Sequence, residues 1–188
     1  MSRLGPHRPT TLEQRIDRLE SLAAIRQLAF RYALCLDSRD MDALVGLFPA
    51  DVRVGRSESG RAALRRWFTK TMSAMRTSVH LIGNHIVDFD DADHARGIVY
   101  CRDELERPEQ GLWQVGVLQY WDRYVRIEGE WYFERRKFHR FYIVDALTRP
   151  RAGAGLEENP LTTIQLPDAF PTWGAFWRQV GNDTDGID

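Results

Sequence analysis

The chain has only two cysteines among its 188 residues, and this scarcity excludes several kinds of protein. Cys35 and Cys101 lie far apart and neither belongs to a Cys-x-x-Cys pair, so we expect no disulfide framework and no structural zinc site. His80 and His85 alone are a thin basis for a metal site, because no Cys or Glu at ligand spacing accompanies them. These absences predict a protein without a metal, located in the reducing cytoplasm.

An excess of one charge and long apolar runs are also lacking. Lys and Arg total 26 against 27 Asp and Glu, so a net charge of -1 leaves no basic field to hold nucleic acid. No apolar run approaches the roughly 20 residues that a membrane-spanning helix needs. The chain has no glycine-rich phosphate loop, and residues 1–11 lack the apolar core of a secretory signal. We therefore expect no nucleic acid, no membrane and no cofactor as partners.

A long amphipathic repeat opens the sequence. Apolar residues recur at three- and four-residue steps over residues 12–37, which predicts one long helix. Thr11 and Gln14 have the spacing of a capping box at its start, and the polar run around Asp37 ends it. Two shorter helices are expected over residues 41–48 and 61–75.

From residue 78 the pattern changes to long strands separated by turn residues. Helices followed by an antiparallel meander predict an α+β fold with the helices on one face of the sheet. A strongly curved sheet packed against three N-terminal helices would form a cone-shaped α+β barrel with a cavity. The expected strands are a short one over 51–55 and long ones over 78–89, 95–106, 112–127 and 131–145.

Asp37 and His80 are the leading candidates for chemistry. A carboxylate that orients an imidazole makes a general base of useful strength near neutral pH. Asp37 could instead bond only to the local backbone at the end of its helix, but Ser38 or Asp40 can take that part. We interpret the pair as a base that removes a proton beside a carbonyl or a ring.

His85 competes with His80 for this role. The two histidines are five residues apart, so a regular strand would point them to opposite faces. The face of His85 is the more apolar one, which favours His85 as the inward residue. A bulge at Gly83–Asn84 would break this alternation and bring both histidines to the cavity.

Three further side chains complete the candidate site. Tyr32 lies on the apolar stripe of the first helix, about 140° around an ideal helix from Asp37, so the two converge only where that helix frays or turns. Asp103 shares a strand face with Cys101, and an inward carboxylate needs a partner. Arg140 on the last strand is the candidate partner.

Several of these residues resemble the SnoaL-like family of the nuclear-transport-factor-2-like superfamily, from about Leu12 to Tyr142. Within that family the pattern is similar to bile-acid 7α-dehydratase, in which the equivalents of Tyr32, Asp37, His80, Asp103 and Arg140 surround the substrate. It departs from scytalone dehydratase, which has a tyrosine immediately before its aspartate where this chain has Leu36. The resemblance is carried by Arg31–Asp37, Asp40, Asp42–Leu44 and Phe48, by His80–Gly83, and by Glu128–Tyr132.

The resemblance implies a cofactor-independent lyase, most simply a dehydratase, for a hydrophobic cyclic substrate of steroid or polyketide type. His80, Asp37 and Tyr32 would be catalytic, and Asp103, Arg140, His85 and Asn84 would bind substrate. The same residues suit a polyketide cyclase or a ketosteroid-type isomerase. A non-catalytic ligand-binding domain or the small subunit of a ring-hydroxylating dioxygenase is the alternative of a different class.

The resemblance also implies a homo-oligomer, a trimer or else a dimer, built on the outer face of the sheet. We divide the chain into a flexible N-terminus (1–11), a SnoaL-like domain (12–147) and a tail rich in Pro and Gly (148–188). The tail ends in the aromatic stretch 170–177, which must be buried somewhere. It would cover either the mouth of the cavity or a neighbouring subunit.

Overall fold

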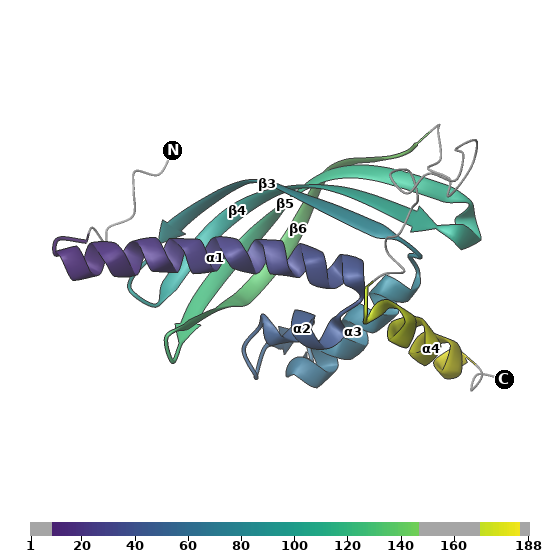
Figure 1. Ribbon diagram of the computed structural model, residues 1–188, viewed down its shortest axis with the longest axis horizontal. Helices are drawn as coiled ribbons and strands as arrows, with labels where there is room; N and C mark the ends of the chain where they lie inside the picture. The colour runs from purple at the N-terminus through teal and green to yellow at the C-terminus, as the bar shows by residue number, and fades with distance from the viewer. Residues whose placement is uncertain (1–8, 147–169, 185–188) are drawn as a thin grey trace.

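A computed structural model describes residues 9–146 and 170–184 of the chain (Figure 1). Three helices precede a four-stranded sheet, and a fourth helix follows it. The helices are α1 (Leu12–Ser38), α2 (Met41–Gly46), α3 (Arg61–Ser73) and α4 (Trp173–Thr184), with a 3-10 turn at Pro108–Gln110; the strands are β1 (Arg53–Val54), β2 (Glu58–Ser59), β3 (Ser78–Phe89), β4 (His94–Arg107), β5 (Leu112–Ile127) and β6 (Glu130–Asp145).

Helix α1 begins and ends at defined caps. The Thr11 side chain accepts from the Gln14 backbone N–H, and the Gln14 side chain accepts from the Thr11 backbone, so the predicted capping box is confirmed. The helix stays regular through Ser38 and stops at Arg39, whose φ of 59° lies in the left-handed region. This αL residue turns the chain directly into α2.

The long strands form one antiparallel meander in the order β3-β4-β5-β6. The sheet is strongly curved (Figure 1). Because β3 and β6 are its edges, it is open rather than closed into a barrel. The pairing register shifts between Ile82 and His85 on β3, and at two places along β5 and β6. Such bulges bend strands, which accounts for part of the curvature. The predicted α+β fold with a cone-like sheet is confirmed.

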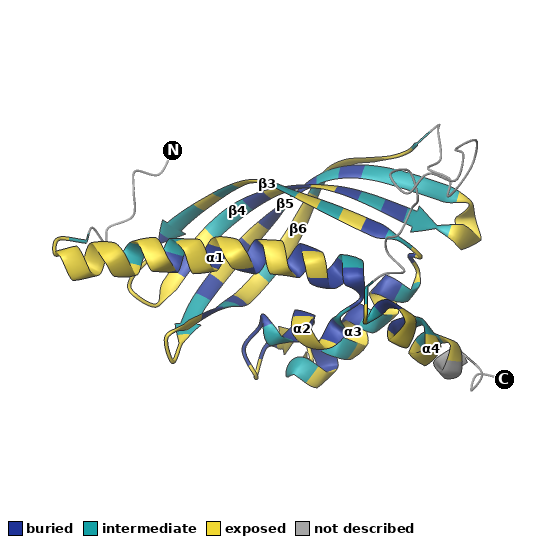
Figure 2. Ribbon diagram, in the orientation of Figure 1, coloured by how far each residue is buried: buried dark blue, intermediate teal, exposed yellow. Residues whose placement is uncertain are grey.

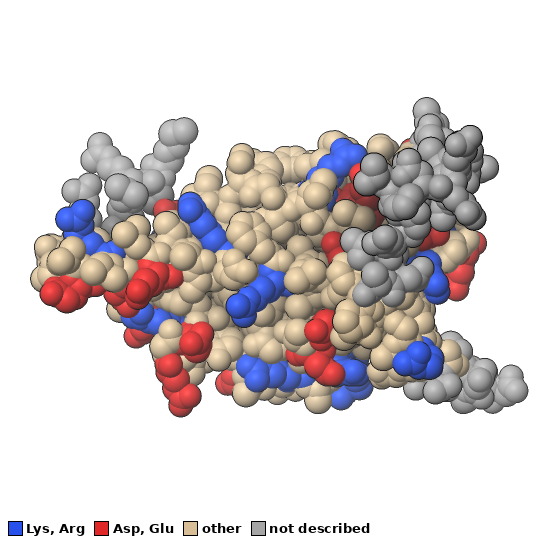
Figure 3. Space-filling view, viewed as in Figure 1, with Lys and Arg blue, Asp and Glu red and all other residues tan. Residues whose placement is uncertain are grey.

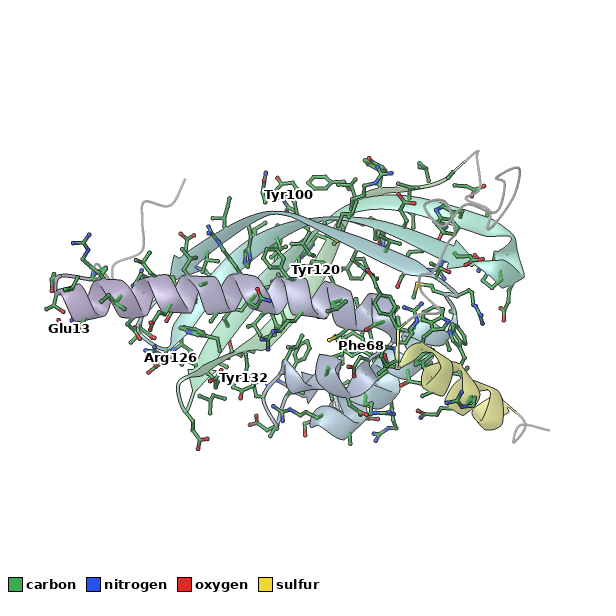
Figure 4. The ribbon with its side chains drawn as sticks, in the orientation of Figure 1. Glu13, Phe68, Tyr100, Tyr120, Arg126 and Tyr132 are labelled. Carbon is green, nitrogen blue, oxygen red and sulfur yellow. The ribbon has the colours of Figure 1, made fainter. Side chains whose placement is uncertain are left out.

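Helix α1 lies across the concave face of the sheet and packs against β3 and β6, while α2 and α3 close the same side (Figure 1). The residues between these layers form one apolar core (Figure 2). Alternate residues of β4 and β5, such as Val99, Cys101, Leu118 and Tyr120, point into it. Tyr120 lies between the sheet and α1, whereas Tyr100 projects from the opposite face (Figure 4).

Helix α4 packs against α3 at the end of α1 (Figure 1). Trp173 and Phe176 are buried there, and Thr172 Oγ1 donates to the Ser38 carbonyl over 2.7 Å. The aromatic stretch of the tail is therefore buried against its own chain. The rest of the predicted tail (147–169 and 185–188) and residues 1–8 of the predicted flexible N-terminus lie outside the described residues.

The charges of the surface are mixed. On the face shown in Figure 3, Lys and Arg alternate with Asp and Glu, and neither sign gathers into a large patch. Within the described segments, no helix is both long and apolar enough to cross a bilayer.

Candidate active site

Asp37 and His80 meet where the end of α1 passes the start of β3. Asp37 Oδ1 lies 2.6 Å from His80 Nδ1, and Asp37 Oδ2 accepts the His80 backbone N–H over 2.8 Å. The imidazole is only 7% exposed and the carboxylate 18%. The two residues that the sequence singled out therefore form one shielded pair.

The hydrogen bonds around Asp37 set the tautomer of His80. Ser78 Oγ donates to Asp37 Oδ1 over 3.0 Å, so this carboxylate accepts three hydrogen bonds in all. An ionised carboxylate only accepts, so the proton of the imidazole resides on Nδ1 and Nε2 keeps a free lone pair. A side chain in this state can remove a proton from a bound molecule.

Asp103 lies beside His80 on the neighbouring strand. The two are direct register partners of β3 and β4, and Asp103 is almost fully buried. Arg140 Nη1 and Nη2 donate to Asp103 Oδ1 and Oδ2, each over 3.1 Å, in a bidentate pair. The predicted partner of Asp103 is therefore present, and charged groups from α1, β3, β4 and β6 follow one another across the concave face.

Gly116 makes this row possible. It is the register partner of Asp103 on β5, between β4 and β6. A Cβ on Gly116 would lie 2.2 Å from Arg140 Nη1 and 2.3 Å from Asp103 Oδ1. The missing side chain therefore leaves the space in which the ion pair crosses β5.

Tyr32 is buried in an aromatic cluster. Its ring packs edge-on against Phe68, Tyr120 and Phe133, and the Arg136 guanidinium lies 4.3 Å from its centroid. Burial raises the pKa of Tyr32 to about 12. Because α1 does not fray before Asp37, the fraying or turning needed for the two to converge does not occur, and Tyr32 faces this cluster.

His85 reaches the concave side through the predicted bulge. The register shift between Ile82 and His85 breaks the alternation, so His80 and His85 lie opposite Asp103 and Val99, which share one face of β4. His85 Nε2 lies 3.0 Å from Tyr124 Oη, which donates to Asp122 Oδ2 over 2.7 Å. Burial lowers the pKa of His85 to about 4, so this imidazole is neutral near pH 7.

Asn84 has a different position. It is exposed at the bulge, as is its neighbour Gly83. The role of Asn84 in substrate binding stays a prediction.

Sequence reasoning missed a buried polar network next to Tyr32. Arg136 Nε and Nη2 donate to the two oxygens of Asp122 over 2.9 and 2.7 Å, and both side chains are almost inaccessible. Asp122 could have been found, since it alternates with Tyr120 and Tyr124 on β5. Arg136 could not have been found, because the register shifts between β5 and β6 make the face of the sheet on which it lies unpredictable from alternation. Arg39 and Ser78, which support Asp37, carried no sequence signal either.

Two cavities of the described surface lie away from the Asp37–His80 pair. One of about 380 Å³ opens beside the first turns of α1, with Arg18, Phe89 and Arg126 in its wall. Another of about 290 Å³ lies between α1 and the β5–β6 turn, near Leu28 and Trp131. Neither is lined by Asp37 or His80. Among the described residues, no three His, Cys, Asp or Glu side chains come together in a way that could hold a metal ion.

Solved structures share this fold. A candidate scytalone dehydratase from Novosphingobium aromaticivorans is 23% identical with a TM-score of 0.60, over 76% of this chain and 98% of that one. The hexachlorocyclohexane dehydrochlorinase LinA-type3 from Novosphingobium barchaimii is 21% identical with a TM-score of 0.64, over 77% and 98%. A nuclear-transport-factor-2-like protein with a cystatin-like fold from N. aromaticivorans is 25% identical with a TM-score of 0.57, over 73% and 92%.

A family model gives the assignment at the level of sequence. The model of the SnoaL-like domain matches residues 17–137, which is well over half of the chain and includes most of α1, the Asp37–His80 pair and most of the sheet. The chain belongs to the SnoaL-like family of the nuclear-transport-factor-2-like superfamily.

Proposed function

We propose that this protein is a cofactor-independent lyase that eliminates water from a hydrophobic cyclic substrate of steroid or polyketide type. The observation that carries the proposal is the 2.6 Å contact between Asp37 Oδ1 and His80 Nδ1, which leaves His80 Nε2 as a shielded base. Two structures that share the fold are named for eliminations, one for a dehydratase and one for a dehydrochlorinase.

In the proposed reaction, His80 Nε2 takes a proton from carbon and becomes an imidazolium that Asp37 stabilises. The electron pair of the C–H bond forms the new double bond while the C–O bond breaks. The imidazolium then returns its proton to the leaving oxygen, and water is released. General acid–base catalysis of this kind contributes about 10² to 10⁴ in rate.

The neighbouring groups have binding roles in this proposal. Arg140 and Asp103 position polar substituents. Phe138, directly opposite Tyr120 on β6 and largely exposed, offers an apolar surface beside Arg140 for a ring. His85 would contact the substrate from the same strand as His80.

The experiment is turnover of a panel of cyclic alcohols and halides that carry an acidic C–H, with products measured by mass spectrometry. We expect wild-type protein to release water or halide from some of them. The rate of His80→Ala should be about 10²- to 10⁴-fold lower. His94→Ala is the matched control, because His94 is exposed at the start of β4. An unchanged rate in His80→Ala would remove the pair from the mechanism.

The products also separate the alternatives. A shifted double bond without loss of a group indicates an isomerase, and a new ring indicates a cyclase. Ligand binding without any turnover indicates a binding domain, and co-purification with a large iron-containing subunit indicates a dioxygenase small subunit.

The proposal includes a homo-oligomer, a trimer or else a dimer, that forms through the outer face of the sheet. Leu81, Ile86 and Trp121 on that face are each more than half exposed. Both cysteine thiols are free and buried, which suits a reducing cytoplasm. Sedimentation of the wild type against Trp121→Lys tests the assembly, and a wild-type monomer would contradict it.

A further inference from the structure

Arg39 is an unusual residue to find at the end of a helix. It has a φ of 59°, a region that costs a residue with a side chain about 1 kcal/mol or more. Its side chain is also 2% exposed, although buried charges are costly unless they are compensated. Glycine would relieve the backbone strain at this position, so the guanidinium itself must supply something.

The guanidinium binds oxygen atoms that surround Asp37. Nη1 donates to the Leu36 carbonyl and, over 2.7 Å, to Ser78 Oγ. Nη2 donates to the carbonyls of Met75 and Arg76 over 2.8 and 3.3 Å. Arg39 thus ties the end of α1 to the segment that leads into β3, which are the two elements that carry Asp37 and His80.

Ser78 connects Arg39 to the pair. Its hydroxyl has a single proton, and its oxygen accepts from Arg39 Nη1. The proton is therefore directed to Asp37 Oδ1, at 3.0 Å, the same oxygen that holds His80 Nδ1. Arg39 fixes the direction of the hydroxyl, and the hydroxyl fixes the carboxylate oxygen that selects the tautomer of His80.

Helix α4 covers Arg39 from the other side. The Arg39 guanidinium lies 5.0 Å from the ring centroid of Trp173 and 5.8 Å from that of Phe176. Both rings are buried, and an aromatic face stabilises a cation at this range. The Thr172 hydroxyl donates to the Ser38 carbonyl, which attaches the start of α4 to the residue before Arg39.

We infer that Arg39 and Ser78 are positioning residues for the Asp37–His80 pair, and that helix α4 holds Arg39 in this place through Trp173. The inference rests on the proposed function for its effect on catalysis. The hydrogen bonds themselves can be measured without a substrate.

The test is proton NMR of protein labelled with ¹⁵N-histidine, with the His80 signals identified from His80→Gln. In the wild type we expect His80 in the Nδ1–H tautomer with a far-downfield, slowly exchanging proton. Ser78→Ala should speed the exchange of this proton about 5- to 10-fold, which matches the net strength of one hydrogen bond. Ser78→Thr, which keeps the hydroxyl, should restore the slow exchange.

Arg39→Met and Trp173→Ala should act in the same direction as Ser78→Ala. Their matched controls are Arg66→Met and Trp67→Ala, because Arg66 pairs with Glu58 and Trp67, half exposed on α3, packs on Phe68. For whichever substrate is turned over, kcat should fall about 10- to 100-fold in Ser78→Ala while KM changes little.

Unchanged exchange of the His80 proton in Ser78→Ala and Arg39→Met, with only a lower unfolding temperature, would show that Arg39 merely joins two elements. Ser78→Ala removes a single oxygen atom and decides the matter if Arg39→Met does not fold. Altered exchange without turnover of any substrate would overturn the proposed function and leave the positioning intact. Turnover that depends on His80, together with unaltered exchange of the His80 proton in Ser78→Ala, would overturn the positioning and leave the proposed function intact.

Discussion

Replacement of Asp37 by asparagine changes one atom and tests the pair at its centre. The carboxylate accepts from His80 Nδ1 and Ser78 Oγ at Oδ1, and from the His80 backbone N–H at Oδ2. An amide has only one accepting oxygen, so one of the two positions must become an NH₂ donor.

Either orientation of the amide harms the site. An NH₂ group at the Oδ2 position would face the His80 backbone N–H, donor against donor. An NH₂ group at the Oδ1 position would donate to His80 Nδ1, so the imidazole proton would move to Nε2 and the base would be lost. We expect kcat to fall about 10²- to 10⁴-fold, which corresponds to a rise of about 2.7 to 5.4 kcal/mol in the activation barrier.

Steady-state kinetics on a substrate found in the panel, together with denaturant unfolding, give both quantities. Loss of a hydrogen bond to a charged group costs about 1.5 to 3 kcal/mol of stability, and the partial exposure of Asp37 places the change at the low end. Asp42→Asn is the control, because Asp42 is 82% exposed in its ion pair with Arg65. A kcat in Asp37→Asn equal to that of the wild type would refute the assigned tautomer and its role.

Gly116→Ala should lower the free energy of unfolding by about 1 to 3 kcal/mol, because its Cβ collides with the ion pair that crosses β5. Gly46→Ala has open space around its Cβ and should be neutral or stabilising. Thermal unfolding of the two variants measures the difference. Arg136→Met leaves a buried carboxylate unpaired and should cost about 3 to 5 kcal/mol, while Arg66→Met breaks only an exposed pair and should cost under about 1 kcal/mol in the same assay. The fold depresses the pKa of His85 from 6.5 to about 4, so the stability linked to its neutral form is complete above pH 6.5 and is lost as the pH falls toward 4; denaturant titrations should show a smaller loss in His85→Gln. If a variant and its control, or His85→Gln and the wild type, lost the same amount of stability, the contact assigned to that residue would be contradicted.

Much of the fold could be predicted because its signals are local. The capping box at Thr11, the three- and four-residue apolar steps of α1 and the turn residues between strands each act within a few residues, and the predicted ranges lie close to the observed elements. The β1–β2 hairpin was only half anticipated, because two-residue strands have almost no periodicity.

The candidate site was predictable only in part. Asp37 and His80 could be paired through the family resemblance. The sequence indicated that a bulge near Gly83 would bring His85 inward, and the pairing register shows a shift between Ile82 and His85. The position of Tyr32 depended on how α1 ends, which is decided by the αL conformation of Arg39 rather than by any local pattern. Arg39, Ser78 and α4 meet from segments far apart in the chain, and no spacing rule brings such residues together.

Exchange of carbon-bound hydrogen tests the base most directly. An enolisable cyclic ketone is incubated with the protein in D₂O, and deuterium at the carbon beside the carbonyl is measured by mass spectrometry. We expect wild-type protein to catalyse the incorporation and His80→Gln to lose it. Equal incorporation by both proteins, or none by a wild type that binds the ketone, would contradict the assignment of His80 Nε2 as the base.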